Sequence, residues 1–395
     1  MTLLEVIAEA ATNPKPFVEP FKCPTIVNSD PILLNLKPES DNQYPSSLVQ
    51  PLTGFQISQF DSYLVDSNSK LFKKLKRKLK NPNSLSSSDF TGILNSFFEK
   101  FRDKLGISAD AESSDEFYTP KLIEKLGSFI GRDVMGLIIE GCFVLENWKL
   151  LETLITNKLV DHGLCSNLVY NLILKRRSDL ICLCVKCFSD LKSSDLCGIL
   201  KYFLGSSKKA YKSMAGVRNE WESQALLAVE KVSDKKLSGK KLGLAKEAAI
   251  LLMVAYDGFS ASELCMHYLL ASSNVDEVVF SAAIGRLNVE EILSLIEYLG
   301  KWLRKYERFP QACPCAKASS ALGLKACQWV PTLEDVVRSL GLVLDEHFSS
   351  LVLHSEFHAA LKALLEVVSS LVSEGKLSCS LANLIEILKP EVTSS

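Results

Sequence analysis

The sequence predicts an all-α protein, built as an irregular α-solenoid or stack of helical hairpins behind a Pro-rich, partly ordered N-terminal segment. Three observations indicate this fold class. Apolar residues recur at steps of three and four, helix-capping residues open one segment after another, and no run of alternating polar and apolar residues marks a sheet. Helices of this kind bury their apolar faces against one another. We find no fixed repeat period, so the solenoid is expected to be irregular.

The chain is expected to fall into four segments. Residues 1–55 contain more than half of the prolines, and because proline disrupts helix interiors this segment should be extended or partly disordered. Residues 56–107 should form two helices, the first strongly basic and the second running from about Asp89. Residues 108–118 are interpreted as an acidic linker, and residues 119–390 as the C-terminal α-helical domain.

Two expected helices carry the most regular apolar stripes. The first runs from Asn288 to about Tyr306, and the second from Ser355 to about Glu374, with Gly375 as the residue that follows its end. The stripe of the first helix consists of Ile292, Ile296, Leu299, Leu303 and Tyr306. The stripe of the second consists of Phe357, Leu361, Leu364, Val368 and Leu371. Both stripes should be buried.

Cap residues and breaker residues place the other boundaries. Thr119 and Pro120 have the character of an N-cap and a first helical residue, and should open the main helical domain. A turn-rich segment over residues 205–242 and a Pro-containing loop over residues 309–330 are expected to interrupt the stack. Three capping boxes are expected, formed by Ser260 with Glu263, Asn288 with Glu291, and Thr332 with Asp335.

Charge and composition exclude several classes of protein. The 45 basic and 46 acidic side chains nearly cancel, so a nucleic acid or an anionic membrane would have to be bound by a local patch. The longest apolar run, Ala248 to Tyr256, is shorter than the roughly 20 residues that cross a membrane. The first residues lack the basic start of a secretory signal, which indicates a cytosolic or nuclear protein whose cysteines are reduced thiols in the core.

The strongest candidate binding element is a basic helical segment between residues 70 and 80. Leu71, Leu75 and Leu79 lie on one side of this helix, and cations cover most of the rest. Such a segment could sit on an RNA backbone, an acidic partner or an anionic membrane, or serve as a nuclear localisation signal. It could equally be a solvated face that its leucines dock onto the protein. The cations are Lys70, Lys73, Lys74, Lys76, Arg77, Lys78 and Lys80.

No group of residues has the spacing of a complete catalytic site. His354 and His358 are four apart, but the position directly after the first histidine, which is glutamate in zinc peptidases, is Ser355. Asp345 and His347 are two apart, so a helix places them on different faces. We also find no Gly-rich phosphate loop and no nucleophile elbow. We therefore expect no catalytic residue and no cofactor.

The cysteine groups do not match a closed metal site either. The loop over residues 309–330 contains three cysteines, Cys313, Cys315 and Cys327. A structural zinc site needs four ligands, so their three thiolates are one too few. Cys182 and Cys184 point about 200° apart on a helix, because each residue turns the chain by about 100°. We expect the cysteines to serve as small core residues and no metal to be bound.

A stretch near the C-terminus, PTLEDVVRSLGLVLDEHFSSLVLHSEFHAALKALLEVVSSLV, contains a Val-Val pair followed by a Leu-Asp-x-His-Phe string. The helix upstream contains IEYLGKWL, from Ile296 to Leu303. With these motifs, residues 288–373 resemble the nucleolar protein eleven family. The motif residues, to which we assign a structural role, are Val336, Val337, Leu344, Asp345, His347 and Phe348.

The resemblance implies a function without catalysis. Members of this family are scaffolds of the small-subunit processome, which acts early on nascent pre-ribosomal RNA and is linked to ribosomal DNA transcription. We therefore expect a scaffold of the nucleus and nucleolus that binds other small-subunit processome proteins and reaches pre-rRNA indirectly. It should bind no membrane and no small-molecule substrate.

The family plan also places a β-propeller ahead of the helices, and this sequence has no such region there. A helix-only relative and a truncated form are the two interpretations. A cytoplasmic or nuclear α-helical adaptor is an alternative function, and a metal-dependent enzyme that uses the histidine or cysteine groups is another. In either of these two alternatives the chain would not be a processome scaffold.

Overall fold

The computed structural model describes residues 59–81, 85–105, 118–205, 208–234 and 238–392. Every regular element in these ranges is a helix and none is a strand, which confirms the all-α prediction. The chain divides into two units at residue 66, and the packing described below is that of the unit from Ser67 onward. The Pro-rich segment 1–55 and all but the last residue of the acidic linker lie outside the described residues.

Three helices come first within the described ranges. They are α3 (Gln59–Leu79), α4 (Ser87–Leu105) and α5 (Tyr118–Leu126), and a short 3₁₀ helix, η2 (Gly127–Phe129), follows α5. Helix α4 starts with a side-chain cap, because the Ser86 hydroxyl accepts the backbone N–H of Asp89 at 3.0 Å. Helix α5 begins one residue before Thr119, so Thr119 lies inside the first turn and is not the N-cap. Pro120 remains in that first turn, where its missing N–H breaks no helical hydrogen bond.

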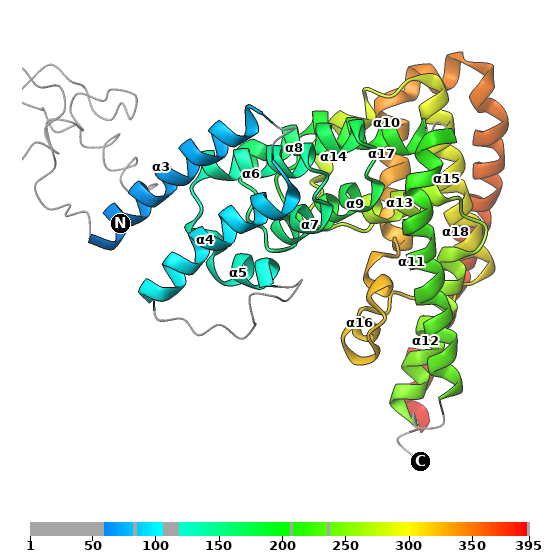
Figure 1. The fold of residues 1–395 in the computed structure, drawn as a ribbon. Coiled ribbons are helices and arrows are strands. Elements are labelled where there is room, and N and C mark those ends of the chain that lie inside the picture. Colours follow the sequence, from blue (N-terminus) through cyan, green and yellow to red (C-terminus); the bar gives the residue numbers. More distant parts are fainter. Residues whose placement is uncertain (1–58, 82–84, 106–117, 206–207, 235–237, 393–395) are drawn as a thin grey trace, which may run out of the picture. The chain divides into compact units, whose positions relative to one another are not determined.

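The next five helices form two layers. Helices α5 to α9 each pack against the helix two further along the chain, so that α5, α7 and α9 form one layer and α6, α8 and α10 form the other. Figure 1 shows α6 and α8 on one side of this region and α7 and α9 on the other. Their bounds are α6 (Arg132–Val144), α7 (Trp148–Thr156), α8 (His162–Leu174), α9 (Ser178–Cys187) and α10 (Ser193–Leu204).

Two of these helical hairpins repeat with a period of 30 residues. Helices α6 and α7 begin at residues 132 and 148, and α8 and α9 begin at 162 and 178. Buried positions repeat at the same interval, for example Ile138 with Leu168 and Cys142 with Leu172. Two consecutive hairpins therefore share one spacing, while the described helices from residue 240 onward begin at unequal intervals, so the stack is an irregular solenoid as expected.

The same turn joins the two helices of each repeating pair. Glu146 and Arg176, which follow the ends of α6 and α8, have left-handed φ angles of 52° and 56°. The next backbone N–H in each turn bonds a carbonyl in the last turn of the helix, from Asn147 to Cys142 at 2.9 Å and from Arg177 to Leu172 at 3.0 Å. This is the Schellman pattern, which satisfies carbonyls that the helix end leaves free.

The segment expected to be turn-rich is mostly helical. Helix α11 (Lys208–Ser233) occupies most of residues 205–242, and it packs against α9, α12 (Lys240–Tyr256) and α13 (Ala261–Leu270). Its buried side chains are Met214, Val217, Trp221, Ala225 and Ala228. The expected break in the stack is therefore wrong, because α11 presents a continuous apolar stripe that continues the layer of α9.

The last part of the chain contains α14 (Glu277–Ile284), α15 (Val289–Arg308), α16 (Ala316–Leu322), η3 (Lys325–Trp329), α17 (Leu333–Leu353), η4 (Ser355–Phe357) and α18 (His358–Val392). Helix α15 packs against α17 and α18. The three predicted capping boxes are all present, at the starts of α13, α15 and α17. The predicted loop over residues 309–330 is only partly a loop, since it contains α16 and η3.

The two helices predicted from their stripes differ in how well they match. Every stripe residue of α15 is buried, as predicted. Of the second stripe, Phe357 in η4 and Leu364 in α18 are buried, whereas Leu361, Val368 and Leu371 of α18 are half-buried. The predicted end at Gly375 is wrong, because α18 continues through this residue to Val392. From residue 372 to residue 383 every side chain of α18 is exposed.

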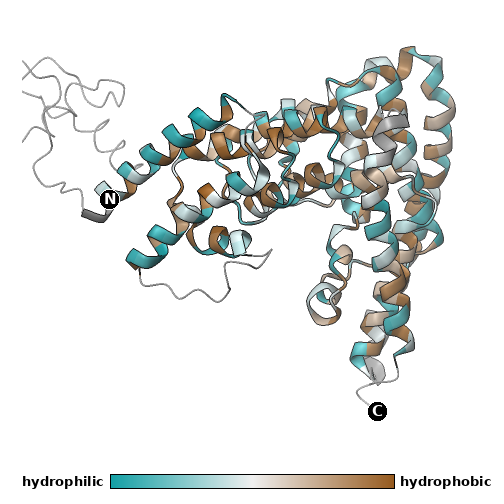
Figure 2. Ribbon diagram, in the orientation of Figure 1, coloured by the Kyte–Doolittle hydropathy of each residue, from teal (hydrophilic) through white to brown (hydrophobic). Residues whose placement is uncertain are grey.

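The core is apolar with a buried aromatic centre. Figure 2 shows hydrophobic faces turned towards neighbouring helices and hydrophilic faces turned outward. At the centre lies His267 of α13, which is fully buried against the rings of Trp221, Phe259 and Trp302. Most of the described cysteines are buried and none is in a disulfide, which agrees with their predicted role as small core residues.

Candidate nucleic-acid interface on helix α3

Helix α3 is fixed to the protein along one side. Leu71 and Leu75 are buried, with 5% and 0% of their surface exposed, and Leu79 is half-buried. Asn68 adds a two-point polar contact, in which its amide donates to the Phe129 carbonyl at 3.0 Å and its side-chain oxygen accepts the Gly131 N–H at 2.7 Å. The predicted leucine side of the basic segment is therefore its docking side.

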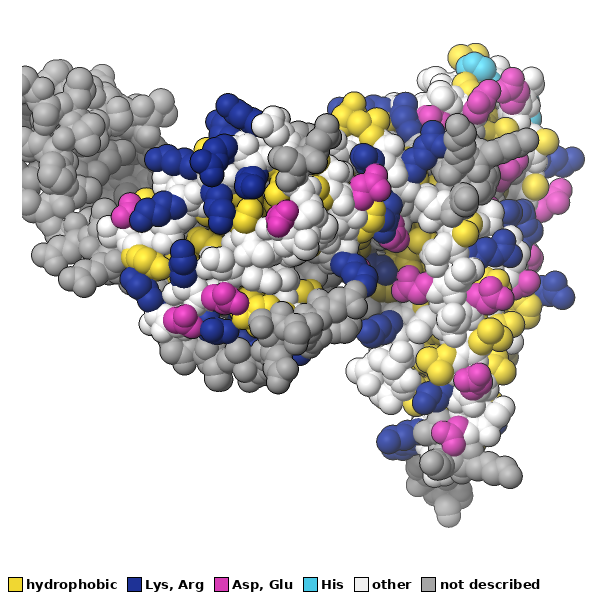
Figure 3. Space-filling view, viewed as in Figure 1, with side chains coloured by type: hydrophobic (Ala, Val, Ile, Leu, Met, Phe, Trp, Pro, Cys, Tyr) yellow, Lys and Arg dark blue, Asp and Glu magenta, His cyan; other side chains and the backbone are white. Residues whose placement is uncertain are grey.

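The opposite side of α3 carries the cations. Lys70, Lys73, Lys74, Lys76, Arg77 and Lys80 are exposed and Lys78 is half-buried. Figure 3 shows Lys and Arg side chains gathered along this helix. With about 100° of turn per residue, these seven side chains cover a sector of about 200° that excludes the leucines. The docked and the binding interpretations of the segment are thus compatible, because they use different faces.

The cations of α3 are not neutralised by neighbouring carboxylates. None of the seven takes part in an ion pair with another described residue. The ammonium of Lys76 lies over the Phe72 ring at 5.4 Å from its centre. The pKa of Asp89 is held below its ordinary value, first by hydrogen bonds from Ser86 and to a lesser extent by Lys78. Asp89 thus lies near one end of the cationic surface, and Asp66, an exposed carboxylate four residues before Lys70, lies at the other.

Such a surface suits a polyanion. Lysine and arginine side chains that replace the counterions of phosphates bind nucleic acid without reading its sequence. Sequence readout of single-stranded RNA needs exposed aromatic side chains that stack on bases, and Phe72 of α3 is half-buried and already covered by Lys76. The arrangement therefore fits contact with a phosphate backbone.

The histidine pair with the spacing of metal ligands is occupied by backbone contacts. His354 Nδ1 lies 2.9 Å from the Ser350 carbonyl, and His358 Nε2 lies 3.1 Å from the Val352 carbonyl. His354 is the C-terminal cap of α17, and Ser355 begins η4, not the expected helix. No cluster of three or more metal-ligating side chains occurs among the described residues.

The cysteine group of the 309–330 loop is split between surface and core. Cys313 is exposed, whereas Cys315 and Cys327 are buried. Burial raises the pKa of the Cys327 thiol to about 12, and the nearby Cys315 contributes in the same direction. Cys182 and Cys184 are both buried and Cys187 is half-buried. Thiols with raised pKa values are poor nucleophiles and poor metal ligands at neutral pH.

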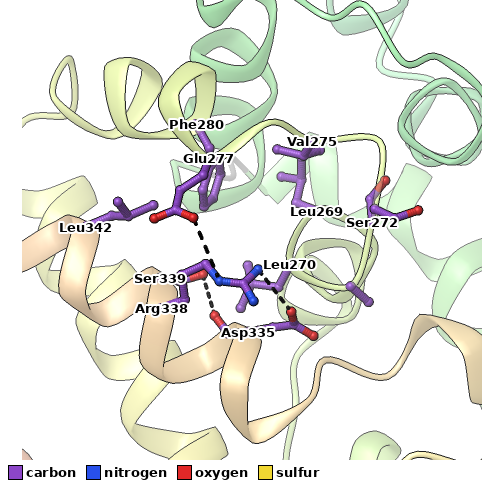
Figure 4. A pocket seen from close by; sticks show the side chains of 12 residues that line it. Leu269, Leu270, Ser272, Val275, Glu277, Phe280, Asp335, Arg338, Ser339 and Leu342 are labelled. Carbon is purple, nitrogen blue, oxygen red and sulfur yellow. Dashed lines mark hydrogen bonds and ion pairs between the residues drawn. The ribbon is translucent and has the colours of Figure 1, made fainter.

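A polar pocket lies between α13, α14 and α17 and has a volume of about 270 Å³. Figure 4 shows Arg338 at its centre, directed at Glu277 and Asp335. The guanidinium lies 4.0 Å from Glu277, 3.6 Å from Asp335 and 2.9 Å from Glu334, so its charge is matched inside the protein. This pocket joins α14 to α17 and has no free charged group to hold a ligand.

A comparison with protein families identifies the chain. The family model of the nucleolar protein 11 C-terminal domain matches residues 130–392, which is well over half of the sequence. The chain belongs to the nucleolar protein 11 family. Membership implies a nucleolar protein with a role in ribosome biogenesis. None of the curated proteins compared with the chain matches it. Within the described ranges, no helix is both long enough and apolar enough to span a membrane.

The nucleolar protein 11 motif residues on α17 lie on two faces of the helix. Val336 and His347 are buried, and His347 Nε2 lies 2.9 Å from the carbonyl of Ile284. Val337, Leu344 and Phe348 are exposed, Phe348 by 69%. Asp345 is exposed as well, so this residue and His347 lie on different faces, as predicted.

The exposed motif residues belong to a longer surface that sequence reasoning missed. Helix α17 carries outer apolar residues at steps of three or four, with Gly341 among them and a kink at His347, where φ is −119° and ψ is 15°. Their spacing is the signal that could have revealed the surface, because these residues run parallel to the inner stripe of Val336, Leu340, Val343 and Leu351. The outer stripe consists of Leu333, Val337, Leu344, Phe348 and Val352.

Proposed function

We propose that this chain is a non-catalytic scaffold of the small-subunit processome that assists early 18S pre-rRNA processing and the linked transcription of ribosomal DNA. The observation that carries this proposal is the match to the nucleolar protein 11 C-terminal domain over residues 130–392. The surface of the described residues supports it, since the charged groups at its polar pocket are paired and its exposed faces suit macromolecules.

The outer stripe of α17 is proposed as the contact for other processome proteins. Exposed apolar side chains at helical spacing are typical of a face on which another helix packs. Phe348 and Val352 are more than half exposed, and neither fills a place in the core. Burying these two side chains in a complex would stabilise it by roughly 1.5–3 kcal/mol for each fully covered side chain.

The scaffold role is tested by affinity purification from cells that carry the tagged chain. We expect the wild-type chain to bring down small-subunit processome proteins, and the Phe348→Ser, Val352→Ser variant to recover less of them with unchanged folding by circular dichroism. A matched control is Leu377→Ser, because Leu377 is 67% exposed on α18 and lies outside the stripe. Absence of processome proteins from the wild-type sample, or a fusion protein excluded from the nucleolus, would contradict the proposal.

Processing itself has a separate readout. Depletion of the chain should raise the amount of 18S precursors relative to mature 18S rRNA, measured on blots with probes for the precursor spacers. The wild-type gene should restore the ratio and the stripe variant should restore it less well. Normal 18S maturation after depletion would leave the processing role without support.

The cationic face of α3 is proposed as a patch that contacts the pre-rRNA backbone or targets the chain to the nucleus. Replacing Lys73, Lys74 and Arg77 by Gln should weaken binding to a structured RNA. The slope of log affinity against log salt should fall by about 0.7–0.9 for each phosphate that the patch no longer neutralises. A control with the same change of charge is Lys246, Lys362 and Lys376 to Gln, all exposed on other helices.

The two roles of the α3 patch give different results. A patch that contacts RNA loses affinity while a fluorescent fusion stays nucleolar. A targeting patch leaves the fusion outside the nucleus while RNA affinity is unchanged. Equal behaviour of the α3 variant and the control variant in both measurements would exclude both roles and leave a solvated face.

A further inference from the structure

The end of helix α15 and the outer side of α12 form a groove that is separate from the α3 patch and the outer stripe of α17. The groove has a volume of about 420 Å³ and apolar walls from α12. Ile250 and Met253 reach the surface there, 37% and 43% exposed, and Phe309 after the end of α15 faces them. Figure 3 shows hydrophobic side chains at the surface in the region of α12.

A second hollow continues this groove and is cationic. It has a volume of about 370 Å³ and shares Asp257, Lys305 and Phe309 with the apolar groove. The other cations that line it, Lys301, Arg304 and Arg308, come from successive turns of α15. The combined site is therefore apolar at one end and positively charged at the other.

The charge of the second hollow is only partly matched within the protein. Lys305 bonds Asp257 at 2.9 Å, and Lys301 bonds Glu263 at 2.7 Å. Arg304 and Arg308 are exposed and form no ion pair with another described residue, although the Arg308 guanidinium lies 5.4 Å from the centre of the Phe309 ring. Two guanidinium groups one helical turn apart are thus free to bind carboxylates.

We propose that this composite groove binds an acidic amphipathic helix of a partner protein, with apolar side chains against α12 and carboxylates on Arg304 and Arg308. Charge complementarity selects this occupant, because a basic or neutral helix would leave both guanidinium groups without a partner. Helix-in-groove binding places apolar residues at steps of three and four into a groove of this kind. The inference names a partner class for the proposed scaffold and rests on that function.

The test uses the full chain and a synthetic peptide of about 15 residues with Leu on one helical face and Glu on the other. Fluorescence anisotropy measures its binding. We expect saturable binding that weakens with salt, and a loss of about tenfold in affinity in Arg304→Glu, Arg308→Glu, equivalent to about 1.4 kcal/mol. A peptide with Lys in place of Glu should bind this variant better than it binds the wild-type chain.

Two controls separate the groove from general electrostatics. Arg286→Glu reverses one exposed arginine away from the groove, and should bind the acidic peptide as the wild-type chain does. Met253→Ser shortens the apolar wall and should weaken binding at high salt, where the charged contacts are screened. Loss of affinity in Arg286→Glu equal to that in the arginine pair would overturn the proposal, as would unchanged binding in both groove variants.

Other occupants give their own outcomes. If the groove bound a second copy of the chain, the wild-type protein would self-associate in sedimentation at concentrations where Met253→Ser stays monomeric, and the peptide proposal would fail. The wild-type chain could also fail to bind the peptide and still co-purify with processome proteins. That result would support the scaffold function and contradict only the proposal for this groove.

Discussion

Among single residues, His267 has the most unusual environment. Its Nε2 lies 3.0 Å from the Ala255 carbonyl, and its Nδ1 lies 2.8 Å from the Tyr298 hydroxyl. A carbonyl only accepts hydrogen bonds, so Nε2 carries the proton and Nδ1 accepts from Tyr298. The Tyr298 oxygen in turn accepts the indole N–H of Trp302 at 3.2 Å. This chain of hydrogen bonds is complete only while the histidine is neutral.

The neutral form of His267 makes stability depend on pH. Burial lowers its pKa to about 3 from an ordinary value of 6.5. Between these two pH values His267 is protonated in the unfolded chain and neutral in the folded protein. Its contribution therefore lowers the free energy of unfolding as pH falls below about 6.5. The slope from this group approaches 1.4 kcal/mol per pH unit, that is about 2.303RT. Denaturant unfolding at pH 5 and pH 7 measures it.

The variant His267→Gln isolates that contribution. It should be less stable at pH 7, because glutamine does not fill the aromatic cage, but its stability should fall less steeply between pH 7 and pH 5. An equal slope in both proteins would mean that other groups cause the acid sensitivity.

Two glycines give a matched pair of stability predictions. A Cβ on Gly141 of α6 would lie 2.6 Å from two ring atoms of Phe90, which is fully buried and cannot move aside. Gly141→Ala should therefore destabilise the protein by about 1–3 kcal/mol. Gly92 of α4 has no neighbour within 4 Å, so Gly92→Ala should stabilise it by about 0.5–1 kcal/mol. Thermal unfolding of both variants measures the difference in sign.

The sequence pattern predicted the burial of side chains correctly in some helices and incorrectly in others. The inner stripe of α15 follows from helical period alone. The exposure of Phe348 does not, because a phenylalanine in an apolar helix is ordinarily a core residue. Phe348 lies outside because the inner stripe of α17 is filled without it.

Among the helices, α18 differs most from its predicted form. Glycine after an apolar stripe commonly ends a helix in the left-handed conformation, and the prediction placed Gly375 there. The structure keeps Gly375 within the helix, with no atom within 4 Å of a Cβ built on it. Its neighbours Val372 and Leu377 are both exposed, so the part of α18 from residue 372 to residue 383 has an exposed apolar side.

The variant Gly375→Ala distinguishes the two forms of α18. Within a continuous helix, alanine should stabilise the helix by about 0.5–1 kcal/mol and slow amide exchange in residues 372–383. At a left-handed helix end it would do the opposite. Gly323→Ala is the control, because Gly323 ends α16 with a φ of 73° and should lose stability on substitution.

Helix α11 shows why an element can be missed entirely. Ser206, Ser207 and the pair Lys208-Lys209 suggest a polar turn, and Gly216 interrupts the segment. The stripe that holds the helix is partly alanine, at Ala225 and Ala228, which contributes little hydrophobic signal. Packing against α12 and α13 decides the structure of this segment, because tertiary contacts override weak local preference.

At the scale of the whole molecule, the layered packing predicts graded stability. Helix α13 contacts α9, α10, α11 and α17, whereas residues 372–383 of α18 are exposed on every side. Amide hydrogen exchange should therefore be slowest in α13 and fastest, among the described helices, in that part of α18. Mass spectrometry of the exchanging protein measures both. Equal protection in the two regions would indicate that α18 is covered by another molecule in solution.

The fold class could be predicted from the sequence, but the period of the stack could not. All-α architecture follows from helical stripes and caps that each helix carries by itself. The 30-residue spacing of the two hairpins appears in their helix starts, turns and buried positions, whereas equivalent positions differ in residue type, as Cys142 and Leu172 do. The α3 patch could be located from its composition, whereas the composite groove is lined by residues of α12 and of the end of α15 that lie far apart in the sequence.

The repeated turn at Glu146 and Arg176 allows the chain to change in length between homologues. The helices of the two hairpins start at equivalent positions, 30 residues apart, and neither internal turn depends on glycine for its left-handed residue. Tandem duplication of one hairpin would therefore add a unit whose internal turn already fits. Homologous chains built on this plan should differ in length by whole hairpins in this region, in steps of about 30 residues.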